Sequence, residues 1–302
     1  MHTPIGHQEM PKGAIRLLEV GEDLWRFEFP RLDERVFDLF SEVMDLDESG
    51  ASGRARKELR LLLEGYPEFL DAYQLLGSIH STAGRDEQAT KTWIQGLDVA
   101  LAAFPEGFQF GRSRIPWSMM ENRPFLRLCQ TLGFDLLERG DVPGALLLFE
   151  TILSLNPNDN QGIRGAAIDC YFTLGQPELV LSLCREYPHD ALEHVLYGRA
   201  LALYQMGKEK AARGALRRAI ETYPRVAKEL VKKTHRPPKE LMPDRVTHGG
   251  QDQAYYYWFE QGHHWKLTPG ALAFVAEGLA SLTKPPDPQS KAAGRGSGRG
   301  QD

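Results

Sequence analysis

The feature that most constrains this chain is one spacing of small, apolar and proline residues that recurs along it. Between residues 125 and 157, two apolar series at helical spacing are separated by Gly140. Counted from that glycine, the marks fall at +5, +9, +12 and +17, where the sequence has Ala145, Phe149, Ile152 and Pro157. Gly50 and Gly207 are followed at the same intervals by Ala55, Leu59, Leu62 and Pro67, and by Ala212, Leu216, Ala219 and Pro224. Each unit predicts two antiparallel helices joined by a tight turn.

Two further glycines begin units that match this spacing only in part. The unit of Gly84 ends late, at Pro105, so its second helix is expected to be about a turn longer. The unit of Gly175 ends early, at Pro188, so its second helix is expected to be short. Together with the three full matches, these units predict a repeated architecture.

The turn glycines Gly140, Gly175 and Gly207 lie 35 and 32 residues apart. This spacing and the helix–turn–helix pattern resemble the tetratricopeptide repeat (TPR), a unit of about 34 residues. We therefore expect an all-α fold, a right-handed α-solenoid of about five TPR-like helical hairpins over residues 33–225.

Shorter blocks narrow the resemblance. Pro116-Trp117 and the stretches 121–127 and 155–162 look like segments of bacterial TPR proteins of unassigned role. They are also similar, more distantly, to the suppressor of tumorigenicity 7 family. The segments Trp25–Pro30 and Trp265–Leu272 resemble the same bacterial group. This resemblance implies a helical scaffold and no reaction.

The segment before the repeats, residues 13–32, predicts extended structure. Trp25 and Phe27 alternate with charged residues, which is typical of a strand with one buried face. Residues 21–23 provide a turn that would fold this strand back on the preceding residues as a small ribbon. Residues 1–12 are expected to be disordered.

The segment after the repeats predicts a helical cap over residues 226–283. An array of stacked repeats needs such a cover at its open end, because the last hairpin would otherwise expose its apolar face. Residues 284–302 are rich in proline, glycine and polar residues, so a disordered tail is expected there.

Polar residues before three of the expected helices predict their N-caps. Asp33 precedes the first repeat helix, and Thr268 precedes the last helix of the cap. Asn158 is followed three residues later by Gln161, which is the spacing of a capping box.

An inserted loop, residues 105–124, interrupts the repeat array. A connection of this length inside a compact array is uncommon and is often functional. It carries aromatic residues beside arginines, among them Phe108, Trp117 and Arg123. Two interpretations remain open: a structural plug that covers the seam between the second and third units, or a flap whose Trp117 and arginines contact a ligand.

The expected binding site is the concave groove of the array. In repeat scaffolds of this kind the first helix of each unit lines the groove, because the second helix packs behind it. The candidate partner-binding residues are Trp117, Asn122, Arg123, Arg127, Gln130, Arg164, His194, Tyr197 and Tyr204. We expect them to hold a protein or peptide segment of unknown identity. The groove positions have no run of lysines and asparagines, so they depart from the chaperone-tail carboxylate clamp known in the TPR family.

A basic segment, residues 208–239, contrasts with the rest of the chain. It has 11 lysines and arginines against three glutamates, whereas the whole sequence has a net charge of -5. Such asymmetry indicates either a solvated outer face or a site for an anionic polymer or ribosome-associated role. No nucleic-acid motif or interleaved aromatic series accompanies it, so nucleic acid is the less favoured partner.

Composition sets the outer limits. No apolar run in the 302 residues approaches the roughly 18 that a membrane span needs. The three cysteines, Cys129, Cys170 and Cys184, have no metal-like spacing and suit core positions in a reducing cytoplasm. The sequence has no phosphate-binding glycine loop, HExxH motif or nucleophile elbow. It therefore predicts a cytoplasmic, non-catalytic protein with no cofactor and no metal, and leaves its oligomeric state open.

Overall fold

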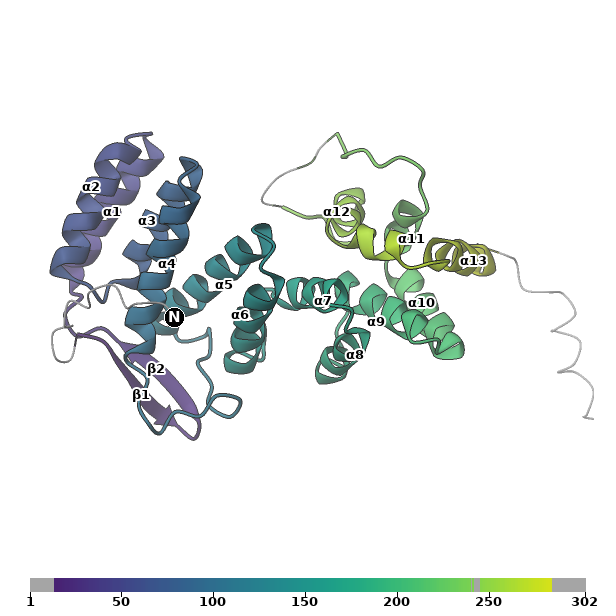
Figure 1. The fold of residues 1–302 in the computed structure, drawn as a ribbon, viewed down its shortest axis with the longest axis horizontal. Coiled ribbons are helices and arrows are strands. Elements are labelled where there is room, and N and C mark those ends of the chain that lie inside the picture. The colour runs from purple at the N-terminus through teal and green to yellow at the C-terminus, as the bar shows by residue number, and fades with distance from the viewer. Residues whose placement is uncertain (1–13, 240, 242–244, 284–302) are drawn as a thin grey trace, which may run out of the picture. The chain divides into compact units, whose positions relative to one another are not determined.

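The computed structural model describes residues 14–239, 241 and 245–283, so the disorder predicted for residues 1–12 and 284–302 lies outside it. Five consecutive helix–turn–helix pairs run through the described chain (Figure 1). They are α1 (Glu34–Glu48) and α2 (Ser52–Gly65), α3 (Leu70–Thr82) and α4 (Asp86–Leu101), α5 (Arg123–Glu138) and α6 (Val142–Leu155), α7 (Arg164–Thr173) and α8 (Pro177–Glu186), and α9 (Glu193–Gln205) and α10 (Glu209–Thr222). The predicted all-α helical-repeat class is confirmed.

The remaining elements flank these pairs. A two-stranded sheet, β1 (Arg16–Gly21) and β2 (Leu24–Glu28), precedes α1, and a short 3-10 helix, η1 (Met120–Asn122), leads into α5. After the fifth pair come α11 (Pro224–Leu230), α12 (Gln251–Leu267) and α13 (Ala271–Thr283). The chain divides into two compact units between Cys170 and Tyr171.

The turns of the five pairs follow from their glycines. In the third pair, Gly140 has φ +81° and donates its N–H to the carbonyl of Leu137, while Asp141 donates to Leu136. These two bonds end the helix with a left-handed residue, a conformation that a side chain would strain. The other turn glycines also have positive φ: Gly50, Gly84, Gly175 and Gly207. The turn positions predicted from the sequence are thus confirmed.

The spacing after each glycine marks the buried face of the second helix. Ala55, Ala145 and Ala212, at +5, are all fully buried. In the third pair, a Cβ placed on Gly133 would lie 2.6 Å from the ring of Phe149, which stands at +9. The small residues are therefore required where the two helices approach. The predicted lengths of the second helices are also confirmed. The longer one, α4, has 16 residues and the shorter one, α8, has 10, compared with 14 in α2.

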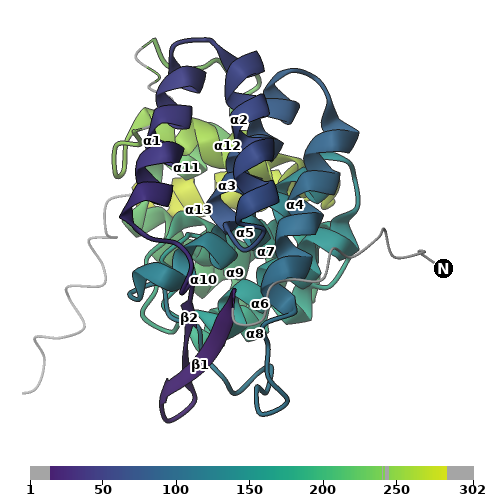
Figure 2. The same cartoon turned by 90° about the vertical axis from the view of Figure 1, so that its left-hand side faces the viewer.

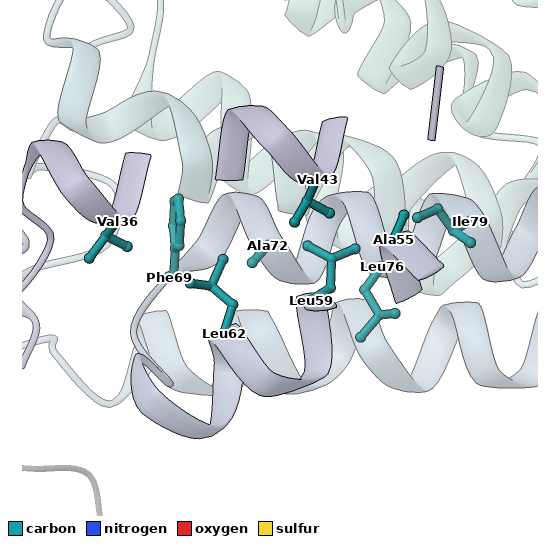
Figure 3. Close-up of a cluster of buried hydrophobic side chains, with 9 residues drawn as sticks. All are labelled: Val36, Val43, Ala55, Leu59, Leu62, Phe69, Ala72, Leu76 and Ile79. Carbon is teal, nitrogen blue, oxygen red and sulfur yellow. The ribbon is translucent and has the colours of Figure 1, made fainter. Parts of the chain in front are cut away.

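The first unit builds its N-terminal core from three helices. Figure 3 shows the buried side chains Val36 and Val43 of α1 facing those of α2 and α3. Figure 2 shows α1 to α4 side by side, with the β1–β2 ribbon at one end of them. The strands are antiparallel and pair Leu17 with Phe27, so the ribbon predicted from the alternation of Trp25 and Phe27 is confirmed.

The cap predictions have mixed outcomes. Asp33 accepts the N–H of Val36 as predicted, at 3.1 Å. The capping box of Asn158 is wrong, because Asp159 adopts φ +47° and brings its carboxylate to the N–H groups of Ile163 (2.7 Å) and Arg164 (3.1 Å). Thr268 is also wrong as an N-cap, since its hydroxyl donates to the carbonyl of His264 within the preceding helix α12.

The second unit covers its last hairpin with the C-terminal helices. Helix α12 packs against α9 and α11, and α13 packs against α10 and α11. The largest fully buried side chains here are Tyr197 of α9 with Tyr257 and Trp265 of α12. The helical cap thus stabilises this unit by removing large aromatic rings from water.

The cysteines and hydropathy complete the fold. Cys129, Cys170 and Cys184 are all buried, and burial raises the pKa of the Cys129 thiol to about 12. These thiols behave as small apolar core groups. Among residues 14–239, 241 and 245–283, no helix has the length and apolar character to span a membrane.

Candidate protein-interaction surface

The inserted loop is anchored to the ribbon and to α6 in the first unit. The main-chain N–H of Arg114 donates to the carbonyl of Asp23 at 2.7 Å, and the carbonyl of Arg114 accepts the N–H of Trp25 at 2.8 Å. These two bonds add one parallel bridge to the ribbon. Ile115 is fully buried and donates its N–H to the carbonyl of Leu155 at 2.8 Å. Residues 114 and 115 of the loop are therefore hydrogen-bonded to the ribbon and to the last residue of α6.

Aromatic rings from three segments form a cluster under the loop. Phe104 contacts Phe108 with ring centroids 4.6 Å apart, and Phe108 meets Trp25 of β2 edge-on at 5.4 Å. Phe27 of β2 completes the cluster against Phe125 of α5 at 5.3 Å. These are the contacts of a structural plug, the first of the two interpretations of the insertion.

Asn122 is a correction to the predicted binding residues. Its side chain is completely buried, with Oδ1 accepting the N–H of Phe27 at 3.0 Å. Its Nδ2 donates to the carbonyls of Trp25 (3.0 Å) and Pro116 (3.1 Å). The amide therefore joins the ribbon to the insertion, an arrangement that we call the Asn122 clasp. Because it is completely buried, it cannot contact a partner.

Trp117 and Arg123 form a half-buried pair at the end of the insertion. The guanidinium of Arg123 lies over the Trp117 ring, 5.3 Å from its centroid, and its Nε donates to the Trp117 carbonyl at 3.0 Å. The N–H of Trp117 donates to Oδ1 of Asn156 at 3.2 Å. A cation over a tryptophan face and two hydrogen bonds hold the pair in one geometry.

Helices α3 and α5 pack together and share a polar face. Arg127 of α5 reaches Asp71 of α3, with 3.5 Å between Nη1 and Oδ1. Burial raises the pKa of the Asp71 carboxyl, which the Arg127 charge only partly offsets. Gln130 accepts a 2.6 Å hydrogen bond from Gln161, and Phe134, one turn further, is 39% exposed. This shared α3–α5 face holds two of the predicted residues, Arg127 and Gln130.

One buried polar atom on the shared α3–α5 face, Arg127 Nε, lacks a hydrogen-bond partner within the described residues. The side chain of Arg127 is nevertheless 41% exposed, so this atom lies just below the surface. A buried polar atom without a partner costs free energy, which a bound group with matching donors and acceptors would recover.

Arg164, another predicted binding residue, forms an ion pair within the first unit. Its side chain is 15% exposed, and its Nε lies 2.7 Å from Oδ2 of the fully buried Asp159 carboxylate. Asp159 therefore fixes both the start of α7 and the guanidinium of Arg164.

The three predicted residues of α9 lie in the second unit, where the chain's own C-terminal helices cover them. Tyr197 is fully buried and donates its hydroxyl to the carbonyl of Tyr223 at 2.8 Å. Nε2 of His194 lies 2.7 Å from the carboxylate of Glu260 on α12. The ring of Tyr204 stacks on Phe274 of α13 with centroids 4.7 Å apart. Tyr197 is thus not a partner contact. The sequence signal for its burial is the aromatic run 255–265, which contacts Tyr197 through Tyr257 and Trp265.

The basic segment of the second unit divides into two parts. On α10, Arg213 pairs with Glu277 at 3.4 Å and Arg217 with Glu221 at 2.9 Å, with all four side chains more than half exposed. Such pairs form the solvated face that was one of the two interpretations. The cations Arg225 and Lys228 of α11 line a pocket against α12.

The hairpins, their left-handed turn glycines and the small residues between paired helices define a TPR-like helical-repeat protein. A family model described as "Transcriptional repressor TCF25" matches residues 55–257, and the chain belongs to this family. That family is not the suppressor of tumorigenicity 7 family, which corrects the distant resemblance drawn from the sequence. A comparison with curated proteins finds no match.

Solved TPR structures resemble the chain at low identity. A TPR protein from Parabacteroides merdae is 13% identical, with a TM-score of 0.46, over 84% of this chain and 82% of its own. YrrB, described as a TPR protein with an unusual peptide-binding site, is 17% identical, with a TM-score of 0.43, over 62% and 85%. MamA is 13% identical, with a TM-score of 0.45, over 68% and 100%.

Proposed function

We propose that this protein is a non-catalytic interaction scaffold that holds a protein or peptide segment on the shared α3–α5 face. The observation that carries the proposal is Arg127 Nε, a buried donor that has no hydrogen-bond partner within the described residues, in a side chain that is 41% exposed on the same helix as the exposed ring of Phe134. Such a donor matches the C=O group of an extended main chain.

The neighbouring side chains suit the same role. Arg127, Phe134 and the Trp117–Arg123 pair present rigid aromatic and multidentate surfaces, the kinds of residue that dominate binding energy at protein interfaces. The corresponding residues of α9 are covered by α12 and α13, so the proposal rests on the first unit alone. The family's description as a transcriptional repressor fits a scaffold that assembles other proteins without performing a reaction.

Photo-crosslinking in cells tests where the partner binds. A crosslinking amino acid replaces Gln130 or Phe134 on the shared α3–α5 face, and Leu147, 65% exposed on α6, serves as the matched control. We expect one recurring protein adduct from the first two positions and none from the control.

The variant Arg127→Ala gives the second part of this test. It should weaken that adduct at least about tenfold, since one charge-assisted interaction contributes roughly 1.5–3 kcal/mol. Equal adducts from Leu147, or no change with Arg127→Ala in a chain that melts normally, would contradict the proposal.

A further inference from the structure

A pocket of about 210 Å³ lies between α11 and α12 in the second unit. Its lining residues are Arg225, Lys228, Glu229, Lys232, Gln251 and Ala254. Lys228 follows Arg225 by one helical turn on α11, and Lys232 lies just beyond the end of that helix. Three cations therefore surround one small volume.

The single carboxylate in the pocket is already neutralised. Glu229 is 5% exposed, and its two oxygens are bound by Lys232 Nζ and, at 3.0 Å, by His235 Nδ1. Arg225 donates one Nη1 hydrogen to the carbonyl of Gly249, which leaves the rest of its guanidinium donors available. Lys228 is exposed and has no ion pair among the residues that the structure describes. The pocket thus has a surplus of positive charge.

The surplus does not come from a helix end. Asp252 lies in the first turn of α12, where its negative charge offsets the positive end of the helix, and its Oδ2 accepts the N–H of Thr247 at 2.6 Å. The positive charge comes from side chains, and those of Arg225 and Lys228 have no carboxylate partner among the described residues. The pocket therefore favours an anion. Fork-like arginine and point-like lysine donors together are the usual ligands of a phosphate group.

From this geometry we infer that the pocket binds the phosphate of a phosphorylated serine or threonine in a partner protein. The volume suits one phosphorylated side chain, and two of the α10 cations, Arg213 and Arg217, are paired with Glu277 and Glu221. Trp258 of α12 is not open for stacking a base, because its ring is covered by the His235 ring, 3.5 Å away between centroids, and by Lys266 Nζ, 4.3 Å from its centroid. The inference rests on the proposed scaffold function only in taking a protein as the carrier of the phosphate.

Fluorescence anisotropy with the full chain tests the site. The probes are a labelled degenerate phosphoserine peptide library, the same library without phosphate, and a labelled 20-nucleotide RNA, with inorganic phosphate and O-phosphoserine as competitors. We expect the phosphorylated library alone to bind, and both competitors to displace it. Binding should weaken below about pH 6, where the phosphate gains a proton and loses charge.

Two variants locate the binding within the pocket. Lys228→Gln and Arg225→Gln each should weaken phosphopeptide binding about tenfold or more, because each removes a charge-assisted contact. The matched controls Lys210→Gln and Arg218→Gln remove the same charges from exposed positions on α10 and should leave affinity unchanged. Lys228 is exposed, so its variant keeps the native melting temperature and isolates the charge.

Four results would overturn the inference: no phosphate-dependent binding, binding unchanged by both pocket variants, equal loss with the α10 controls, or tighter RNA binding that the pocket variants abolish. Crosslinking from Gln130 on the shared α3–α5 face is the separate readout. If the unaltered chain gives that adduct but binds no phosphopeptide, the scaffold function stands and only the inferred phosphate site is refuted.

Discussion

At the scale of single residues, Asn122 shows how one side chain can hold two segments that no pattern connects. Its amide meets the main chain of β2 and of the insertion through three hydrogen bonds, without any exposure to water. Local spacing predicted the turn glycines and the small residues, because their geometry depends on neighbours within one hairpin. It could not predict Asn122, because two of its three partners, Phe27 and Trp25, lie 95 and 97 residues away.

Asn122→Ala should therefore destabilise the first unit by about 2–4 kcal/mol, since it leaves a buried N–H and a buried carbonyl without partners. Urea unfolding followed by tryptophan fluorescence measures this, because Trp25 lies beside the bond. Asn158→Ala, at an exposed position nearby, is the control and should change stability by less than about 0.5 kcal/mol. Equal effects of the two variants would show that the clasp contributes nothing.

Tyr73 leads to a prediction in alkali. Burial, and secondarily the charge of Glu68, raises its pKa to about 12, above the ordinary value of 10.0. The folded state thus keeps this phenolic proton at a pH where the unfolded chain loses it, so stability is full below pH 10 and falls as the pH rises toward 12. Denaturation midpoints measured between these pH values should fall less steeply in Tyr73→Phe; an identical slope would refute the assignment.

At the scale of elements, the hairpin is the unit that sequence determines best. Its two helices touch through alanine or glycine, and the turn between them needs a left-handed residue, so both requirements leave marks in the sequence. Helix starts were less predictable: Asp159 displaced Asn158 as the capping residue because of its own backbone conformation. The shared α3–α5 face was predicted in part, through Arg127 and Gln130, but Asp71 and Gln161 as their partners required the packing of separate hairpins.

Two adjacent alanines of α10 test the helix contact within a hairpin. Ala212 is fully buried at the +5 position, whereas Ala211 is exposed. Ala212→Leu should cost about 1–3 kcal/mol by overpacking, and Ala211→Leu should be nearly neutral. Thermal melts of the two variants provide the comparison. Similar melting temperatures for Ala212→Leu and Ala211→Leu would mean that α9 and α10 can move apart without a loss of stability.

At the scale of the whole molecule, the C-terminal helices complete the second unit by covering α9. The sequence indicated a cap but not its contacts, because the partners of an aromatic run cannot be read from periodicity. The consequence for function is that residues expected to bind a partner bind the chain itself.

Tyr257 and Phe259, two aromatic residues of α12, separate the covering face from the exposed one. Tyr257 is 1% exposed and accepts the Trp265 Nε1–H at 2.9 Å, whereas Phe259 is 74% exposed. Tyr257→Ala should lower the unfolding free energy of the second unit by about 3–5 kcal/mol. Phe259→Ala should leave it almost unchanged. Urea titration detects the difference, and a stable Tyr257→Ala variant would mean that α12 does not cover α9.

The Asn122 clasp also has a consequence for the order of events during synthesis. The chain emerges from its N-terminus, yet the side-chain partner of the Phe27 N–H, Asn122 Oδ1, is made 95 residues later. At roughly 5–20 residues per second, the ribbon waits about 5–20 seconds before its amide partner exists. For that interval β1 and β2 form a two-stranded hairpin without its anchor, a structure of marginal stability in water. The ribbon, although it is made before the five hairpins, is thus among the last segments to be fixed.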